Sequence, residues 1–170
     1  MQSLLNVYTD LSKTHEHVGS GWTIIKANNI YIEGSRRLPD EATVFQAELM
    51  AIKLAMYELA GKLEALDRYI KVFSDSRAAI QALNSAIITS QVVKDTISAL
   101  YLVGGKVDRL EIAWIKAHVG HWGNERADQL ARESSSQKHN AHGISLPYLG
   151  AAAYQLGNTS SRTITEVKQR

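Results

Sequence analysis

Four carboxylates in this sequence lie where they could act together. Asp10 and Asp75 each follow an apolar run that is typical of a strand, whereas Glu48 and Asp128 lie in segments with helical spacing. Ligand sites in α/β sheets gather at the carboxyl ends of strands, so we expect Asp10 and Asp75 to meet there. Glu48 shares its helix face with apolar residues, and Asp128 also has apolar neighbours, so both should face the sheet. The pattern predicts that the four acids converge.

A cluster of four carboxylates needs a compensating positive charge. Like charges a few ångströms apart repel by about 1–4 kcal/mol per pair at intermediate dielectric. Because the donors are all oxygen and the sequence has no cysteine, the expected partner is a hard cation, Mg²⁺ or Mn²⁺. Two such ions about 4 Å apart would activate a water molecule and stabilise the leaving oxygen of a phosphodiester.

The composition is that of one ordinary domain. The chain has 170 residues, of which 45% are hydrophobic and 21% charged, which excludes a wholly disordered protein. The lack of cysteine excludes disulfides, a thiolate nucleophile and a Cys-type zinc site, and it favours a reducing compartment. The N-terminus does not have the pattern of a secretion signal, so we expect an intracellular protein, in nucleus or cytoplasm, without a membrane partner.

Charge is distributed unevenly along the chain. Residues 1–132 carry 15 Lys and Arg against 15 Asp and Glu, while residues 133–170 carry 4 against 2. A neutral body argues against a broad surface for phosphates. If metal ions cancel the four clustered acids, however, the body gains a modest positive excess that could follow a phosphate backbone.

Hydrophobic periodicity predicts the elements that must position the acids. Three strands joined by short links form an antiparallel meander, in which the first strand ends at Asp10 and a hairpin turns at Asn28-Asn29. A helix capped by Asp40 or Thr43 runs to Gly61, and the rest of the order is strand, two helices, strand and helix. The expected fold is α/β: a mixed five-stranded sheet, with the meander plus two parallel strands, flanked by helices.

The C-terminal part of the chain is predicted to lie outside the folded domain. Asn124 can cap the last predicted helix, which ends near residue 133. We therefore divide the chain into a domain over residues 1–133 and a linker with a C-terminal tail over residues 134–170. Short helices are expected in the tail at about residues 150–156 and 163–168.

Four segments carry a resemblance to a known family. YTDLSKT, TVFQAELMAI, FSDSRAAIQAL and WIKAHVGHWGNERADQLA resemble, in order and spacing, the signature blocks of type I ribonucleases H. The match spans about residues 4–133 and is most similar to the ribonuclease H domains of non-LTR retrotransposon polyproteins. The last block is the most specific, because it combines Trp114, His118, Asn124 and Asp128 in one run.

The resemblance implies an endonuclease that hydrolyses the RNA strand of RNA/DNA hybrids and leaves 5′-phosphate ends. It assigns Asp10, Glu48, Asp75 and Asp128 as catalytic ligands of two Mg²⁺ or Mn²⁺ ions. His118 would carry a proton or assist product release, which suits a side chain with a pKa near neutrality.

The resemblance also suggests substrate contacts and partners. Thr43 would hold a phosphate of the DNA strand, Arg77 would lie beside the hybrid, and Asn124 would belong to the substrate-binding set. The implied role is the removal of template RNA during reverse transcription, with a reverse transcriptase domain of the same polyprotein as partner.

Departures from the family pattern leave alternatives open. Leu11 stands where the family usually has glycine, which could crowd the metal site. Only 38 residues separate Asp75 from Trp114, too few for the extra basic helix of many cellular relatives, so a weak grip on the hybrid is expected. The chain could instead be an inactive ribonuclease H-like connection module of a polyprotein, or a nuclease of the same fold that acts on DNA.

Overall fold

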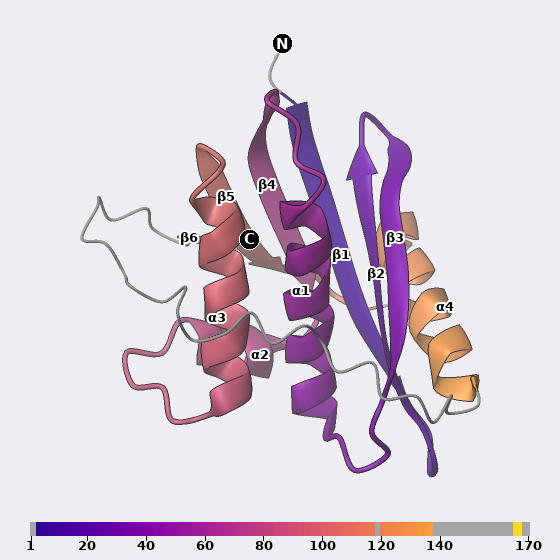
Figure 1. Cartoon of the computed structure of the whole chain (residues 1–170). Helices are drawn as coiled ribbons and strands as arrows, with labels where there is room; N and C mark the ends of the chain where they lie inside the picture. Colours follow the sequence, from indigo (N-terminus) through magenta and orange to yellow (C-terminus); the bar gives the residue numbers. More distant parts are fainter. Residues whose placement is uncertain (1–2, 118–119, 138–164, 168–170) are drawn as a thin grey trace.

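The computed structural model of the chain is built on one mixed β-sheet with helices on both faces (Figure 1). It describes residues 3–117, 120–137 and 165–167. The sheet has the order β3-β2-β1-β4-β5-β6. Its strands are β1 (Ser3–Lys13), β2 (Val18–Lys26), β3 (Asn29–Leu38), β4 (Asp67–Ser74), β5 (Arg109–Trp114) and β6 (Thr165–Val167). The first three strands are antiparallel, and β4, β5 and β6 follow β1 in parallel. The predicted five-stranded mixed sheet is therefore confirmed over β1 to β5, and β6 adds a sixth strand beside β5.

Four helices in the described part of the chain cover the sheet. They are α1 (Val44–Ala60), α2 (Arg77–Leu83), α3 (Gln91–Gly104) and α4 (Trp122–Ser136). Figure 1 shows α1 and α3 side by side over one face, whereas α4 lies on the opposite face beside β2 and β3. The main core fills the space between the sheet and α1 to α3, with fully buried side chains such as Leu5, Val72, Ile52 and Leu100. None of the helices in the described ranges has the length and apolar character of a membrane span.

Local sequence explains where α1 begins. Thr43 is the N-cap, and its Oγ1 accepts a hydrogen bond of 3.1 Å from the backbone N–H of Gln46. The Gln46 side chain in turn accepts one of 2.9 Å from the backbone N–H of Thr43. This reciprocal capping box confirms Thr43, and not Asp40, as the N-cap. At the other end, Gly61 is the C-cap, as predicted.

Two strand features differ from expectation. β1 does not end at Asp10: its parallel pairing with β4 stops at Tyr8, but its antiparallel pairing with β2 continues to Lys13. The hairpin turns at Ala27 and Asn28, which both have positive φ, so the turn lies one residue earlier than predicted. Pairing with β2 extends β1 beyond Asp10. The alternation of apolar residues within β1 does not predict this pairing.

The start of α4 was also predicted wrongly. Asn124 is not the cap: the N-cap is His121, and Asn124 lies in the first turn, 3% exposed. The helix includes Gly123, where a Cβ would lie 2.4 Å from the ring of Tyr8. Glycine therefore serves a close approach to β1 here rather than a break before the helix.

Glycines also let α4 lie directly on β2. A Cβ at Gly19 would lie 2.4 Å from the carbonyl oxygen of Ala131, and one at Gly21 would lie 2.3 Å from that of Ala127. Such contacts are far shorter than real Cβ atoms allow. The two positions therefore set how closely the helix approaches the sheet.

The C-terminal region contains one further correction. Residues 165–167 form a strand, β6, that pairs in parallel with β5, where a short helix was expected over residues 163–168. α4 runs to Ser136, three residues beyond the predicted end of the domain. The helix expected near residues 150–156 lies outside the described residues.

Candidate metal centre

Three of the four predicted acids meet at one point. Asp10, Glu48 and Asp75 each offer a carboxylate oxygen, and these three oxygens lie within 4.8 Å of one another. They come from three different elements: β1, α1 and the turn between β4 and α2. Since β1 and β4 stop pairing after Tyr8 and Phe73, Asp10 and Asp75 lie where the two strands separate.

Glu48 reaches this point from the buried face of α1. It is 6% exposed, as the apolar stripe around it predicted. Next to it, the carbonyl oxygen of Ala47 accepts a hydrogen bond of 2.9 Å from Ser20 Oγ, which ties this turn of α1 to β2. Among the described residues, Glu48 Oε2 is buried and has no hydrogen-bond partner.

The fourth acid, Asp128, lies close by but outside the group of three. Its side chain is 17% exposed, and its carboxylate forms an i,i+4 ion pair with Arg132. Arg132 Nε donates a hydrogen bond of 3.1 Å to Asp128 Oδ1. The negative charge of Asp128 nevertheless raises the pKa of Asp10, so the two carboxylates act on each other through space.

Burial and mutual repulsion make the cluster hard to ionise. Burial, followed by the charges of Asp75 and Asp10, raises the pKa of Glu48 to about 9. Burial, followed by the charge of Asp75, raises the pKa of Asp10 to about 7, although the backbone N–H of Leu11 donates a hydrogen bond that partly opposes this rise. Without a cation, burial and repulsion favour the protonated form of Glu48 and shift Asp10 toward its protonated form, and a bound positive charge would oppose both shifts.

The residues present fit a hard divalent cation. Three oxygen donors converge, Glu48 Oε2 is buried without a partner among the described residues, and the repulsion would fall on binding of a positive charge. Asp10, Glu48 and Asp75 could therefore hold a metal ion.

The other predicted site residues lie on the elements around this cluster. Thr43 is exposed at the N-terminus of α1, and Arg77 is exposed at the start of α2. Asn124 is buried, which leaves little of it for contact with a substrate. His118 lies outside the described residues.

Leu11 has an apolar environment. Its side chain packs against the small core cluster of Val18, Leu38 and Ala47. It also keeps an ordinary backbone conformation, because the positive-φ residues other than glycine in the described part of the chain are Ala27 and Asn28. Glycine is therefore not required at this position.

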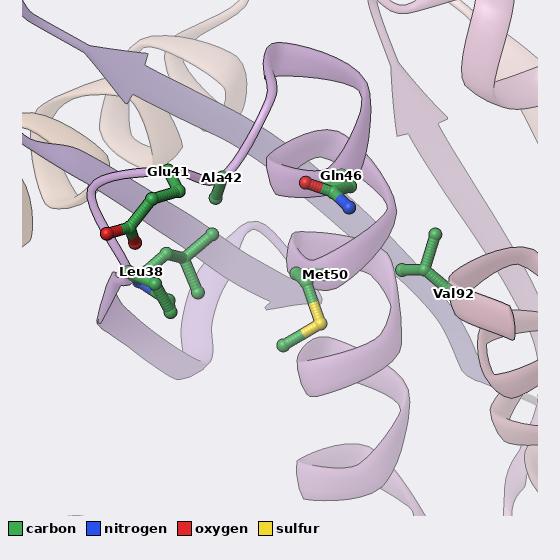
Figure 2. A pocket seen from close by; sticks show the side chains of 7 residues that line it. Leu38, Glu41, Ala42, Gln46, Met50 and Val92 are labelled. Atoms are coloured by element: carbon green, nitrogen blue, oxygen red, sulfur yellow. The ribbon is translucent and has the colours of Figure 1, made fainter.

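A groove of about 430 Å³ opens elsewhere on the described surface (Figure 2). None of the predicted site residues lines it. Its lining is mainly apolar and includes one acid, so it does not suit a phosphate backbone. The lining residues are Leu38, Pro39, Glu41, Ala42, Gln46, Met50 and Val92. The candidate reaction centre is therefore the carboxylate cluster and not this groove.

Comparisons of the sequence and of the structure with known proteins all find ribonucleases H. A family model described as RNase H matches residues 2–136. A Ribonuclease H of Campylobacter jejuni is 29% identical over 138 residues, which cover 77% of this chain and 90% of that protein. RNase H1 from the halophilic archaeon Halobacterium salinarum has a TM-score of 0.61 at 24% identity, covering 77% of this chain and 96% of that one. LC11-RNase H1, solved in complex with an RNA/DNA hybrid, has a TM-score of 0.60 at 19% identity, covering 79% and 96%.

Proposed function

The chain belongs to the ribonuclease H family, and from this premise we propose that it hydrolyses the RNA strand of RNA/DNA hybrids. The observation that carries the proposal is the convergence of three carboxylate oxygens within 4.8 Å on a sheet of this family. One structural relative was solved with an RNA/DNA hybrid bound, which supports the choice of substrate class.

We propose that Asp10, Glu48 and Asp75 hold Mg²⁺, or Mn²⁺, and that Asp128 completes the set when two ions and the substrate are bound. Divalent ions held there would lower the pKa of a water molecule and stabilise the leaving oxygen of the phosphodiester. Glu48 and Asp10, whose pKa values are raised, must lose their protons before they can act as ionised oxygen ligands.

The reaction then proceeds by in-line displacement at phosphorus. A water oxygen forms a bond to phosphorus while the bond to the 3′ oxygen breaks, which leaves a 5′-phosphate and, after protonation, a 3′-hydroxyl. We assign proton transfer or product release to His118, because a neutral-range pKa suits both tasks. Selection of the RNA strand depends on the 2′-hydroxyl, the group that distinguishes RNA from DNA at a given sugar.

Two side chains around the cluster are proposed to hold the hybrid. Thr43 and Arg77 are exposed on α1 and α2 and would contact backbone phosphates. The described chain between β4 and β5 forms only α2 and α3, and residues 1–132 carry equal numbers of acidic and basic side chains. We therefore propose a weak intrinsic grip, supplemented by a reverse transcriptase domain of the same retroelement polyprotein during removal of template RNA. This role implies a location in nucleus or cytoplasm.

The test is cleavage of a labelled RNA/DNA hybrid by the purified chain in Mg²⁺. Cleavage of the RNA strand alone, inhibited by EDTA, is expected, with single-stranded RNA and duplex DNA left intact. A chain that binds Mg²⁺ but cuts nothing would instead support an inactive connection module. Cleavage of duplex DNA in preference to the hybrid would support a DNA nuclease of the same fold.

A further inference from the structure

Trp114 contacts the turn that carries Asp75. It is the last residue of β5 and pairs in register with Ser74, the last residue of β4. Its indole Nε1 donates a hydrogen bond of 3.0 Å to the backbone carbonyl oxygen of Asp75. The backbone N–H of Ile115 donates another of 3.0 Å to the carbonyl oxygen of Ser74. The end of β5 thus fixes two successive carbonyl groups of this turn.

The same indole ring supports Arg77. The guanidinium carbon of Arg77 lies 4.1 Å from the centroid of the Trp114 ring, within the range of a cation–π contact. Arg77 itself is exposed, and no carboxylate of the described residues forms an ion pair with it. Stacking uses one face of the guanidinium and leaves its N–H edge available for a phosphate.

We propose that Trp114 is a positioning residue that aligns the metal ligand Asp75 and the cationic side chain Arg77 through two parts of one ring. The inference rests on the proposed function, since it takes Asp75 as a ligand and a hybrid phosphate as the partner of Arg77. The indole N–H holds the backbone from which the Asp75 carboxylate extends. The ring face holds the guanidinium beside it.

Two further hydrogen bonds flank Asp75 in the turn. Ser76 Oγ caps α2 by accepting a hydrogen bond of 3.2 Å from the backbone N–H of Ala79, and the backbone N–H of Ser76 donates one of 3.1 Å to Ser74 Oγ. Both bonds involve the residues next to Asp75, which are Ser74 and Ser76. Since the ring packs at the edge of the main core, it is itself held firmly enough to orient the other two groups.

Three variants of the full chain separate the two contacts. Trp114→Phe removes the N–H donor but keeps an aromatic face, so Mg²⁺ binding by calorimetry should weaken about fivefold while hybrid binding in EDTA stays unchanged. Arg77→Ala should weaken hybrid binding about tenfold and leave Mg²⁺ binding unchanged. Trp114→Leu should weaken both. Hybrid binding is read from the fluorescence anisotropy of a labelled RNA/DNA hybrid.

Trp22→Phe is the matched control. It removes an equivalent indole donor, whose bond of 2.7 Å goes to Glu58 on α1, and should change neither affinity. A folded Trp114→Phe chain with wild-type Mg²⁺ affinity, or a folded Trp114→Leu chain with wild-type hybrid affinity, would overturn this inference alone. A wild-type chain that binds no Mg²⁺ would contradict the proposed function and, with it, the Asp75 half of the inference.

Discussion

The backbone N–H of Leu11 donates a hydrogen bond of 2.8 Å to Oδ1 of Asp10. The residue after the first acid therefore serves the cluster through its backbone, which any amino acid except proline supplies. Its side chain packs into a small core instead. We therefore expect the leucine to be compatible with metal binding by the acids.

Leu11→Gly should consequently destabilise the chain without improving the site. Loss of a half-buried leucine and gain of a flexible residue within β1 should lower the free energy of unfolding by about 2 kcal/mol. Mg²⁺ affinity, measured by calorimetry, should remain unchanged. An increase in affinity would show that the leucine does crowd the acids.

Asp75→Asn should separate activity from stability. The charge of Asp75 raises the pKa of both Asp10 and Glu48, so its removal relieves repulsion in the metal-free protein. We expect cleavage to be lost and the free energy of unfolding in EDTA to rise by about 1–2 kcal/mol. Asp95→Asn makes the same chemical change on α3 and should preserve cleavage. A destabilised Asp75→Asn chain would contradict the repulsion.

Stability of the metal-free chain should depend on pH. The pKa of Glu48 is raised from 4.5 to about 9, and that of Asp10 from 3.8 to about 7, so the folded state retains protons that the unfolded state releases. The free energy of unfolding should therefore decline as pH rises from about 4 to about 9. Urea titrations in EDTA measure this decline.

Glu48→Gln supplies the control for this pH dependence, because an amide does not titrate. Its unfolding free energy should change less with pH than that of the wild type. Added Mg²⁺ should act in the opposite direction and stabilise the wild-type chain most at high pH, where the acids have lost their protons. A wild-type curve as flat as that of the variant would contradict the raised pKa of Glu48.

The two acids on β1 and α4 should differ in importance for Mg²⁺. Asp10 is 7% exposed and belongs to the group of three, whereas Asp128 is more exposed and already paired with Arg132. Without substrate, Asp10→Asn should weaken Mg²⁺ binding by about tenfold or more. Asp128→Asn should weaken it by only about two- to threefold. Equal losses in calorimetry would place both acids in the first binding event.

Thr43 can be tested for phosphate contact without loss of its cap. Aspartate caps helices at least as well as threonine, so Thr43→Asp should leave the free energy of unfolding within about 0.5 kcal/mol of the wild type. Its negative charge should repel a nearby phosphate and weaken hybrid binding in EDTA. Thr43→Ser keeps both roles and is the control. Unchanged hybrid affinity in Thr43→Asp would remove Thr43 from the substrate site.

Periodic features were predictable from the sequence. Alternation located the strands, and the apolar stripe around Glu48 indicated correctly that this acid is buried against the sheet. The capping residue of α1 was also among the predicted candidates, because capping depends on neighbours within one turn. Convergence of Asp10, Glu48 and Asp75 followed from the parallel pairing of β1 with β4.

Contacts between distant segments were not predictable in this way. The strand β6 pairs with β5, and in the first turn of α4 a Cβ at Gly123 would meet the ring of Tyr8. The sequence pattern around Trp114 did not indicate that its indole N–H reaches the backbone carbonyl oxygen of Asp75. Hydrophobic periodicity predicts which face of a helix or strand is buried. It does not predict which polar group a side chain on that face contacts.

The absence of a side chain at Gly21 on β2 affects how closely α4 can approach Asp10. Gly21 stands opposite Asp10 in the β1–β2 register, and a Cβ at Gly21 would lie 2.3 Å from the carbonyl oxygen of Ala127, the neighbour of Asp128. A single added methyl group at this position would push α4 outward and draw Asp128 away from its counterpart on β1. A search for reactive side chains would pass over this position, yet the absence of a Cβ at Gly21 allows α4, and with it Asp128, to lie close to β1.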